Sequence, residues 1–221
     1  MKFRQMCIPV RKSEEEKKEE QQGYDPSHVS ISFDADKRII RIDGEIGEDD
    51  GIIFEEVIEA IRDYIPCDEE GNELQDRPEP LDRLEIHINS EGGSVDAALN
   101  IVSQIEQLKR DGVKVVSFVK EKSCSAAFLI TIVCSYRIMR KYARLMLHPS
   151  WYSIDGDVAL TIDVLRNFIK STDKTWKIFE ELVLENTKID EKLLSKIYKN
   201  GEDFFIDSSE ALKYGCVDKV L

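Results

Sequence analysis

The chain has 221 residues, of which 42% are hydrophobic, so it can bury one good core, and no Pro/Gly/Ser-rich linker divides it. Its net charge of −13 would repel nucleic acids and anionic membranes, which argues against both as partners. No apolar run approaches the roughly 20 residues needed to span a bilayer, and the N-terminus lacks the apolar stretch of a signal peptide. We therefore expect an intracellular, cytoplasmic protein.

Five cysteines and three histidines are the side chains best suited to hold a transition metal. The cysteines form no CxxC pair, and none stands at a metal-ligand spacing from a histidine. Cysteine usage of this kind suits a reducing cytosol. The sequence therefore predicts neither a metal site nor a bound cofactor.

The N-terminal part of the chain is expected to differ from the rest. Residues 11–22 form a charge run rich in Lys, Glu and Gln, which is typical of a solvated tail or a frayed helix. We therefore divide the chain into a charged, flexible tail over residues 1–27 and one folded domain over residues 28–221.

The folded part opens with an alternating pattern over residues 28–42 that predicts a hairpin turning at residues 34–37. After Gly44, apolar residues recur at helical spacing until Pro66 ends the helix. The acidic residues 67–80, which include one glycine and two prolines, are predicted to form an inserted surface loop.

From residue 84 onward, strand and helix patterns alternate regularly. The expected elements are a strand at 84–89, a helix capped by Ser94, a strand at 113–119, a helix at 126–133, and short strands at 136–139 and 145–147. This order predicts an α/β fold with a largely parallel sheet and helices on both faces. Catalytic groups are then expected at the carboxyl ends of the strands.

A long amphipathic helix is predicted over residues 161–186. One domain's core seldom needs a helix of this length, so part of it is expected to contact another subunit; a simple core helix is the alternative. A short helix over 191–198 and a final helix and strand over 208–221 complete the predicted order.

Residues with catalytic potential follow these predicted strands. One strand runs into Gly92 and Gly93, whose backbone can point N–H groups at a developing negative charge. The run Ser-Cys-Ser at 123–125 follows the next strand, and His148 follows a later one. An isolated glycine pair would indicate only a tight turn, but together these residues indicate an oxyanion hole, a nucleophile and a base.

Four segments resemble the Clp-type peptidase family, which comprises the proteolytic subunits of ATP-dependent Clp proteases and their phage-encoded relatives. They are INSEGGS, SCSAAFLI, RLMLH and DFFIDSSEALKYGCVDKVL, in the family's order along the chain. The resemblance implies a crotonase-like fold, which is a spiral of β-β-α units with a mostly parallel sheet and a long handle helix. It also implies serine-type peptide hydrolysis in oligomeric rings.

The resemblance places His148 at the family's catalytic base and Asp203 at its third catalytic position. Histidine can accept a hydroxyl proton near neutral pH and return it to the leaving amine. Asp203 would hold the imidazole tautomer and stabilise the imidazolium. The alternatives are that Asp203 is only a turn residue, or that the neighbouring Glu202 takes its place.

Two residues compete for the nucleophile position. Comparison with bacterial housekeeping members points to Cys124, and comparison with phage-type members points to Ser125. The interval of 23 residues from Ser125 to His148 resembles the phage-type members without a gap, which favours Ser125. A thiolate would also be a competent nucleophile. With Ser125 as nucleophile, the Ala126 N–H would join those of Gly92 and Gly93 around the oxyanion.

The sequence thus predicts a serine endopeptidase that acts on peptides or unfolded proteins, in general proteolysis or in trimming a phage capsid scaffold. We expect a homo-oligomeric ring, either a heptamer or a double ring. An AAA+ unfoldase is a candidate partner, because the chain shows no P-loop of its own. The alternatives are an inactive Clp-like subunit of a mixed ring and, less favoured, a crotonase-fold acyl-CoA enzyme.

Overall fold

The computed structural model describes residues 30–68, 73–74, 78–149 and 161–221. The predicted tail over residues 1–27 lies outside the described residues, as does part of the predicted surface loop. No helix in the described ranges is long and apolar enough to cross a lipid bilayer.

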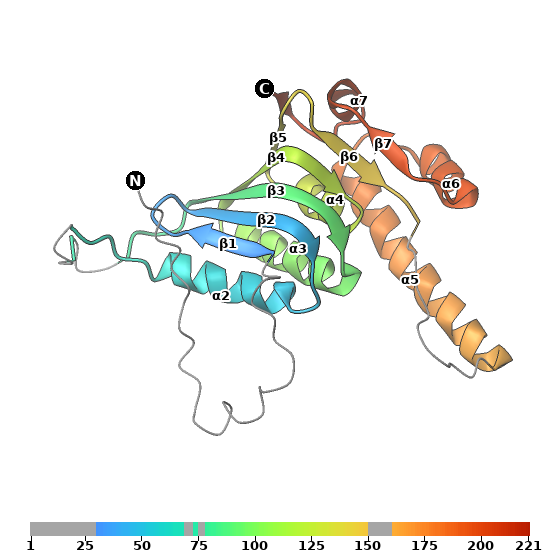
Figure 1. Cartoon of the computed structure of the whole chain (residues 1–221), viewed down its shortest axis with the longest axis horizontal. Coiled ribbons are helices and arrows are strands. Elements are labelled where there is room, and N and C mark those ends of the chain that lie inside the picture. The colour runs from blue at the N-terminus through green and yellow to red at the C-terminus, as the bar shows by residue number, and fades with distance from the viewer. Residues whose placement is uncertain (1–29, 69–72, 75–77, 150–160) are drawn as a thin grey trace.

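An eight-stranded sheet forms the frame of the described structure (Figure 1). Its main path runs β1-β2-β3-β4-β5-β8, while β6 pairs with β4 and β7 pairs with β6. The strands are β1 (Ile31–Asp34), β2 (Ile39–Ile46), β3 (Arg83–Gly93), β4 (Lys114–Cys124), β5 (Tyr136–Met139), β6 (Arg144–Leu147), β7 (Phe204–Ile206) and β8 (Lys219–Val220). All pairings are parallel except the predicted hairpin β1–β2 and the pair β6–β7. The predicted, mostly parallel sheet is confirmed.

Six helices accompany the sheet in the described residues. They are α2 (Asp50–Arg62), α3 (Val95–Arg110), α4 (Ala126–Ile132), α5 (Ile162–Asn186), α6 (Glu191–Asn200) and α7 (Ser208–Lys213). The Ser94 side chain accepts a hydrogen bond from the Ala97 N–H at 3.3 Å, so it caps α3 as predicted. Helix α6 ends at Gly201, which adopts the left-handed conformation with φ of 65°.

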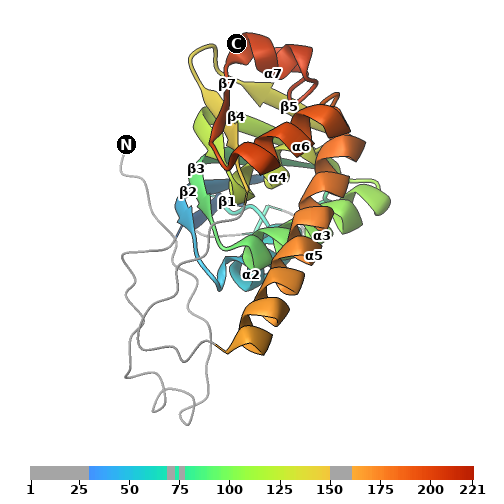
Figure 2. The same ribbon diagram turned by 90° about the vertical axis from the view of Figure 1, so that its right-hand side faces the viewer.

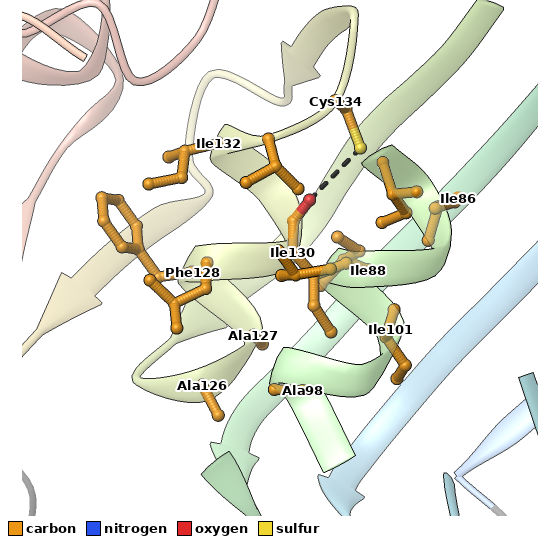
Figure 3. Packing of buried hydrophobic residues seen from close by; sticks show 14 of the residues in the cluster. Ile86, Ile88, Ala98, Ile101, Ala126, Ala127, Phe128, Ile130, Ile132 and Cys134 are labelled. Carbon is orange, nitrogen blue, oxygen red and sulfur yellow. Dashed lines mark hydrogen bonds between the residues drawn. The ribbon is translucent and has the colours of Figure 1, made fainter. Parts of the chain in front are cut away.

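The core lies between one face of the sheet and the helices. On β3, Leu84, Ile86 and Ile88 are completely buried, as their alternation predicted. Figure 3 shows α4 packed between β3 and the Ala98 and Ile101 side chains of α3. All seven residues of α4 are buried, so this short helix is fixed on every side.

Within the part of the chain that the structure describes, the helices do not cover both faces of the sheet as the alternation predicted. In both views, α2, α3 and α4 lie on the same side of the sheet (Figure 1, Figure 2). The opposite face carries the other alternate residues of β3, among them Glu85 and His87, which are only partly buried. These two side chains lie 3.1 Å apart, and His87 also contacts the Phe118 ring. A face with such polar residues does not require a helix to cover it.

Helix α5 has two different halves. Its C-terminal half contributes Trp176, Phe179 and Val183 to the core, and Trp176 also contacts the Tyr198 ring of α6. Its N-terminal half projects away from the sheet (Figure 2) and exposes large apolar side chains. These are Ile162, Val164, Leu165, Phe168 and Ile169.

Strands β3 and β4 extend further than the sequence patterns indicated. Strand β3 continues through the glycine pair, because Glu45 and Ile46 of β2 pair with Gly92 and Gly93. Strand β4 continues to Cys124 because its last residues pair with β6. The two glycines therefore form the paired end of a strand, and the backbone there is held on one side.

Candidate active site

Ser125 and His148 meet at the carboxyl end of the sheet. Ser125 follows β4 and His148 follows β6, and these strands are parallel neighbours with Cys124 opposite Met146. The Ser125 N–H donates to the Met146 carbonyl oxygen at 2.8 Å. His148 Nε2 lies 2.8 Å from Ser125 Oγ, which is a hydrogen-bond distance. The two strand ends therefore hold the hydroxyl and the imidazole in contact.

The backbone of Ser125 has an unusual conformation. Its φ is 53° and its ψ is −124°, which a residue with a side chain rarely adopts. The chain leaves β4 at Cys124 and enters α4 at Ala126, so Ser125 alone forms the turn. A sharp strand-to-helix turn of this kind presents a nucleophile in several hydrolases. The strain is maintained because α4 is completely buried behind it.

Asp203 lies on the other side of His148. The antiparallel register of β6 and β7 pairs Leu147 with Phe204, which brings the residues beyond them together. Asp203 Oδ1 is 3.6 Å from His148 Nδ1, which is an ion-pair distance but longer than a hydrogen bond. Contacts of this type often tighten when substrate binds. Of the two acidic residues considered, Asp203 rather than Glu202 makes this contact.

Burial sets the protonation state of His148. The pKa of His148 lies below its usual value of 6.5, mainly because burial disfavours the charged imidazolium, although the Asp203 charge raises the pKa. The imidazole is therefore uncharged at neutral pH, which is the form that can accept a proton.

Cys124 and Ser123 have different environments from Ser125. Burial raises the pKa of the Cys124 thiol, so this residue stays protonated and weakly nucleophilic. The Ser123 hydroxyl lies 2.8 Å from Thr131 Oγ1, and both side chains are completely buried. Of the three candidates, Ser125 is the one whose hydroxyl contacts His148.

The two glycines are packed too tightly for any side chain. A Cβ atom at Gly92, where φ is 101°, would lie 2.7 Å from the Ser125 Cβ and from the Cys124 carbonyl oxygen. A Cβ atom at Gly93, where φ is 143°, would collide with the backbone of Ile46. Glycine at these positions therefore permits both the backbone conformation and the close approach.

The N–H groups of this region are not equivalent. The Gly92 N–H donates to Ser90 Oγ at 3.0 Å. Its hydrogen is thus directed at a side chain of the same strand, so the expected donation of Gly92 to an oxyanion would require this bond to break. The Ala126 nitrogen lies 3.1 Å from the position of a Cβ on Gly92, so this amide borders the glycine backbone. The sequence reasoning missed Ser90; a hydroxyl residue two positions before a glycine was the available signal.

The described residues include no group of three or more His, Cys, Asp or Glu side chains placed to hold a metal ion. The arrangement instead places a hydroxyl, an uncharged imidazole and a carboxylate in series beside a tight backbone turn. Such a series can activate a hydroxyl as a nucleophile.

Solved structures share this architecture. A ClpP1 point mutant from Listeria monocytogenes matches with a TM-score of 0.63 and 22% identity, over 85% of this chain and 92% of that one. A peptidase from Plasmodium falciparum matches with a TM-score of 0.60 and 17% identity, over 85% of this chain and 97% of that one. The fold is therefore the crotonase-like α/β fold of the Clp-type peptidases, as the sequence predicted.

The family follows from the sequence comparisons. The Clp protease family model matches residues 74–221. The ATP-dependent Clp protease proteolytic subunit of Borreliella afzelii is 29% identical over 136 residues, which cover 62% of this chain and 66% of that protein. The corresponding subunit of Streptococcus mutans is 30% identical over 147 residues, which cover 62% and 67%. The chain thus spans about two thirds of the length of these relatives. It belongs to the Clp protease family, a family of peptidases.

Proposed function

We propose that this protein is a serine endopeptidase in which Ser125, His148 and Asp203 form the catalytic triad. The observation that carries the proposal is the 2.8 Å contact between His148 Nε2 and Ser125 Oγ. The membership of the Clp protease family supports the same reaction. The substrates would be peptides or unfolded proteins, as the name of the relatives suggests.

In the proposed reaction, Ser125 Oγ attacks the carbonyl carbon of the scissile peptide bond while His148 Nε2 takes the hydroxyl proton. The tetrahedral intermediate then expels the amine, which receives that proton from His148. Water, activated by His148 in the same way, adds to the ester that remains and releases the second product. Neutral His148, maintained by burial, is the form required at the first step.

The negative charge of the tetrahedral intermediate needs hydrogen-bond donors that are already in place. We assign the Gly93 and Ala126 N–H groups to this task. Gly92 has a different role in the proposal: its missing side chain allows the strand to lie against Ser125, while its own N–H holds Ser90.

Asp203 is proposed to orient the imidazole and to stabilise the imidazolium that forms during the reaction. Its carboxylate is already at an ion-pair distance from His148 Nδ1. The antiparallel pair β6–β7 would bring the two side chains closer with only a small movement of one strand end.

We also propose that the protein works as an oligomeric ring, with residues 28–221 as the folded unit and the N-terminal half of α5 at an interface between subunits. The exposed apolar side chains of that half support this arrangement. An AAA+ unfoldase would supply protein substrates, and the cysteine usage suits a cytoplasmic location.

The test is labelling with a fluorophosphonate probe followed by peptide mass mapping. We expect an adduct on Ser125 that is absent from Ser125→Ala and His148→Ala but present in Cys124→Ala. An adduct on Cys124 that survives Ser125→Ala would make the enzyme a thiol peptidase. No adduct in a correctly assembled ring would favour an inactive Clp-like subunit. Binding of acyl-CoA would favour a crotonase-fold acyl-CoA enzyme.

A further inference from the structure

Three charged side chains and one aromatic ring form a row across four adjacent strands near Ser125. We call Glu91, Lys122, Arg144 and Phe205 the charged row. Lys122 of β4 and Arg144 of β6 are directly opposite each other in the parallel register. Phe205 of β7 faces Met146, the next outward residue of β6. These side chains lie on the sheet face opposite the helices, since the alternate residues Leu145 and Ile206 belong to the core.

The members of the row interact in two pairs. Lys122 Nζ lies 3.0 Å from a Glu91 carboxylate oxygen. The Arg144 guanidinium lies over the Phe205 ring, 5.7 Å from its centre. Lys122 thus has a carboxylate partner in Glu91, whereas the residues that the structure describes give Arg144 an aromatic ring instead. An arginine held against a ring keeps its N–H edge available for a carboxylate.

The row is close enough to Ser125 to meet a bound peptide. Glu91 precedes Gly92, whose backbone contacts Ser125. The three charged members of the row act on Cys124, the residue before Ser125. Burial raises the pKa of its thiol most, Arg144 and Lys122 lower this pKa, and Glu91 raises it, as does Asp203 outside the row. Arg144 opens β6, and His148 follows the carboxyl end of the same strand, roughly 13 Å further along. The long arginine side chain shortens this separation, so it would reach a peptide about two to three residues from the scissile bond.

We infer that Arg144, supported by Phe205, is a specificity-determining residue that favours an acidic side chain two to three residues from the scissile bond of the substrate. The inference rests on the proposed peptidase function and adds a substrate class to it. The guanidinium can bind a carboxylate through two parallel N–H donors, which a lysine cannot do. Glu91 limits the preference, because it neutralises the second cation of the row.

The experiment compares kcat/KM for a set of internally quenched peptides with one cleavable core. Each peptide carries Asp, Asn or Lys at one position, from three residues before to three residues after the scissile bond. For the native protein, we expect Asp to be preferred over Asn at one of the outer positions by about three- to fivefold, the range for one partly exposed charge pair. The preference should weaken as salt concentration rises.

Variants assign the preference to Arg144. Arg144→Gln should abolish it, Arg144→Lys should retain part of it, and Arg144→Glu should shift the preference to Lys. Glu91→Gln should increase the preference for Asp, because it frees Lys122. The matched control is Lys37→Gln, which removes one positive charge from the β1–β2 turn at the opposite end of the sheet, where Lys37 pairs with Asp34. This control should leave the preference unchanged.

Labelling of Ser125 by the fluorophosphonate probe distinguishes a failure of the inference about Arg144 from a failure of the peptidase proposal. Equal cleavage of the Asp, Asn and Lys peptides by a protein that labels at Ser125 would overturn the role of Arg144 and leave the peptidase proposal standing. A preference for Asp that persists in Arg144→Gln would also overturn it. A protein that neither labels nor cleaves would contradict the proposed function itself, and the inference about Arg144 would fall with it.

Discussion

The Gly92 backbone lies against Ser125 so closely that a single added carbon at position 92 would sit 2.7 Å from the Ser125 Cβ. Gly92 belongs to β3, whereas Ser125 directly follows β4. The position of the Ser125 hydroxyl is therefore determined by the packing of two strand ends as much as by its own turn.

Gly92→Ala should disable the site while leaving most of the fold intact. The new methyl group must displace Ser125 or the Cys124 carbonyl, and either movement separates Oγ from His148. We expect kcat/KM to fall by at least about a hundredfold, because small displacements of reacting groups have effects of this size. The measurement is peptide turnover, with circular dichroism to confirm the fold.

Gly112→Ala is the control for the backbone conformation alone. Gly112 also has a positive φ, 87°, but a Cβ atom there would meet nothing within 4 Å. It should lose about 1 kcal/mol of stability and retain full turnover. If the two variants lost activity equally, the close contact with Ser125 would not be the cause.

The pH dependence of turnover should report the protonation of His148. Because burial holds the pKa of His148 below 6.5, its imidazole is uncharged at neutral pH. The value of kcat/KM should therefore fall only as the pH drops through that lowered pKa. Asp203→Asn removes the charge that raises this pKa, so the acid limb should move to lower pH. The same variant should lose about two to four orders of magnitude in kcat/KM. An acid limb that moved upward would contradict this assignment.

The Ser123–Thr131 pair should contribute to stability and not to chemistry. Either Ser123→Ala or Thr131→Val leaves one buried hydroxyl without its partner, which costs about 1–3 kcal/mol in the free energy of unfolding. The double variant should cost less than the sum, because it removes both groups. Urea unfolding measures these values, and probe labelling of Ser125 should persist in Ser123→Ala. Loss of labelling in that variant without loss of stability would give Ser123 a catalytic role.

The exposed half of α5 should mediate assembly. Leu165→Glu combined with Ile169→Glu places two charges on its apolar side, where both residues are exposed, and should reduce the assembly to smaller species in analytical ultracentrifugation. Arg166→Glu combined with Lys170→Glu, which alters charged positions of the same turns, is the matched control. Native protein that sediments as a 25.4 kDa monomer would contradict the ring.

Several features of the fold and site could be predicted from local patterns. The Ser94 cap, the alternation on β3 and the limits of β5 (Tyr136–Met139) depend on nearby residues, and the structure confirms them. The contact between Ser125 and His148 was also expected, because parallel strands end at one edge of a sheet. Its use in catalysis stays a proposal.

Other features depend on contacts between distant segments, which a single sequence does not reveal. The strand β7 forms only because β6 offers it an antiparallel edge, and this pairing is what brings Asp203 to His148. The bond from Gly92 to Ser90 likewise depends on how the end of β3 is held by β2. The helices were expected on both faces because strands and helices alternate along the chain, yet the partly buried Glu85 and His87 of β3 belong to a face that the described helices leave uncovered.

Helix α4, which bears the Ala126 amide at its first residue and follows directly from Ser125, is also the most completely buried helix described above. Its residues Phe128 and Ile130 belong to the core and also hold the helix that follows Ser125 in place. A substitution that changes the side-chain volume at Phe128 should therefore lower turnover before it unfolds the protein. Substitutions in this part of the core and changes in turnover should therefore be coupled.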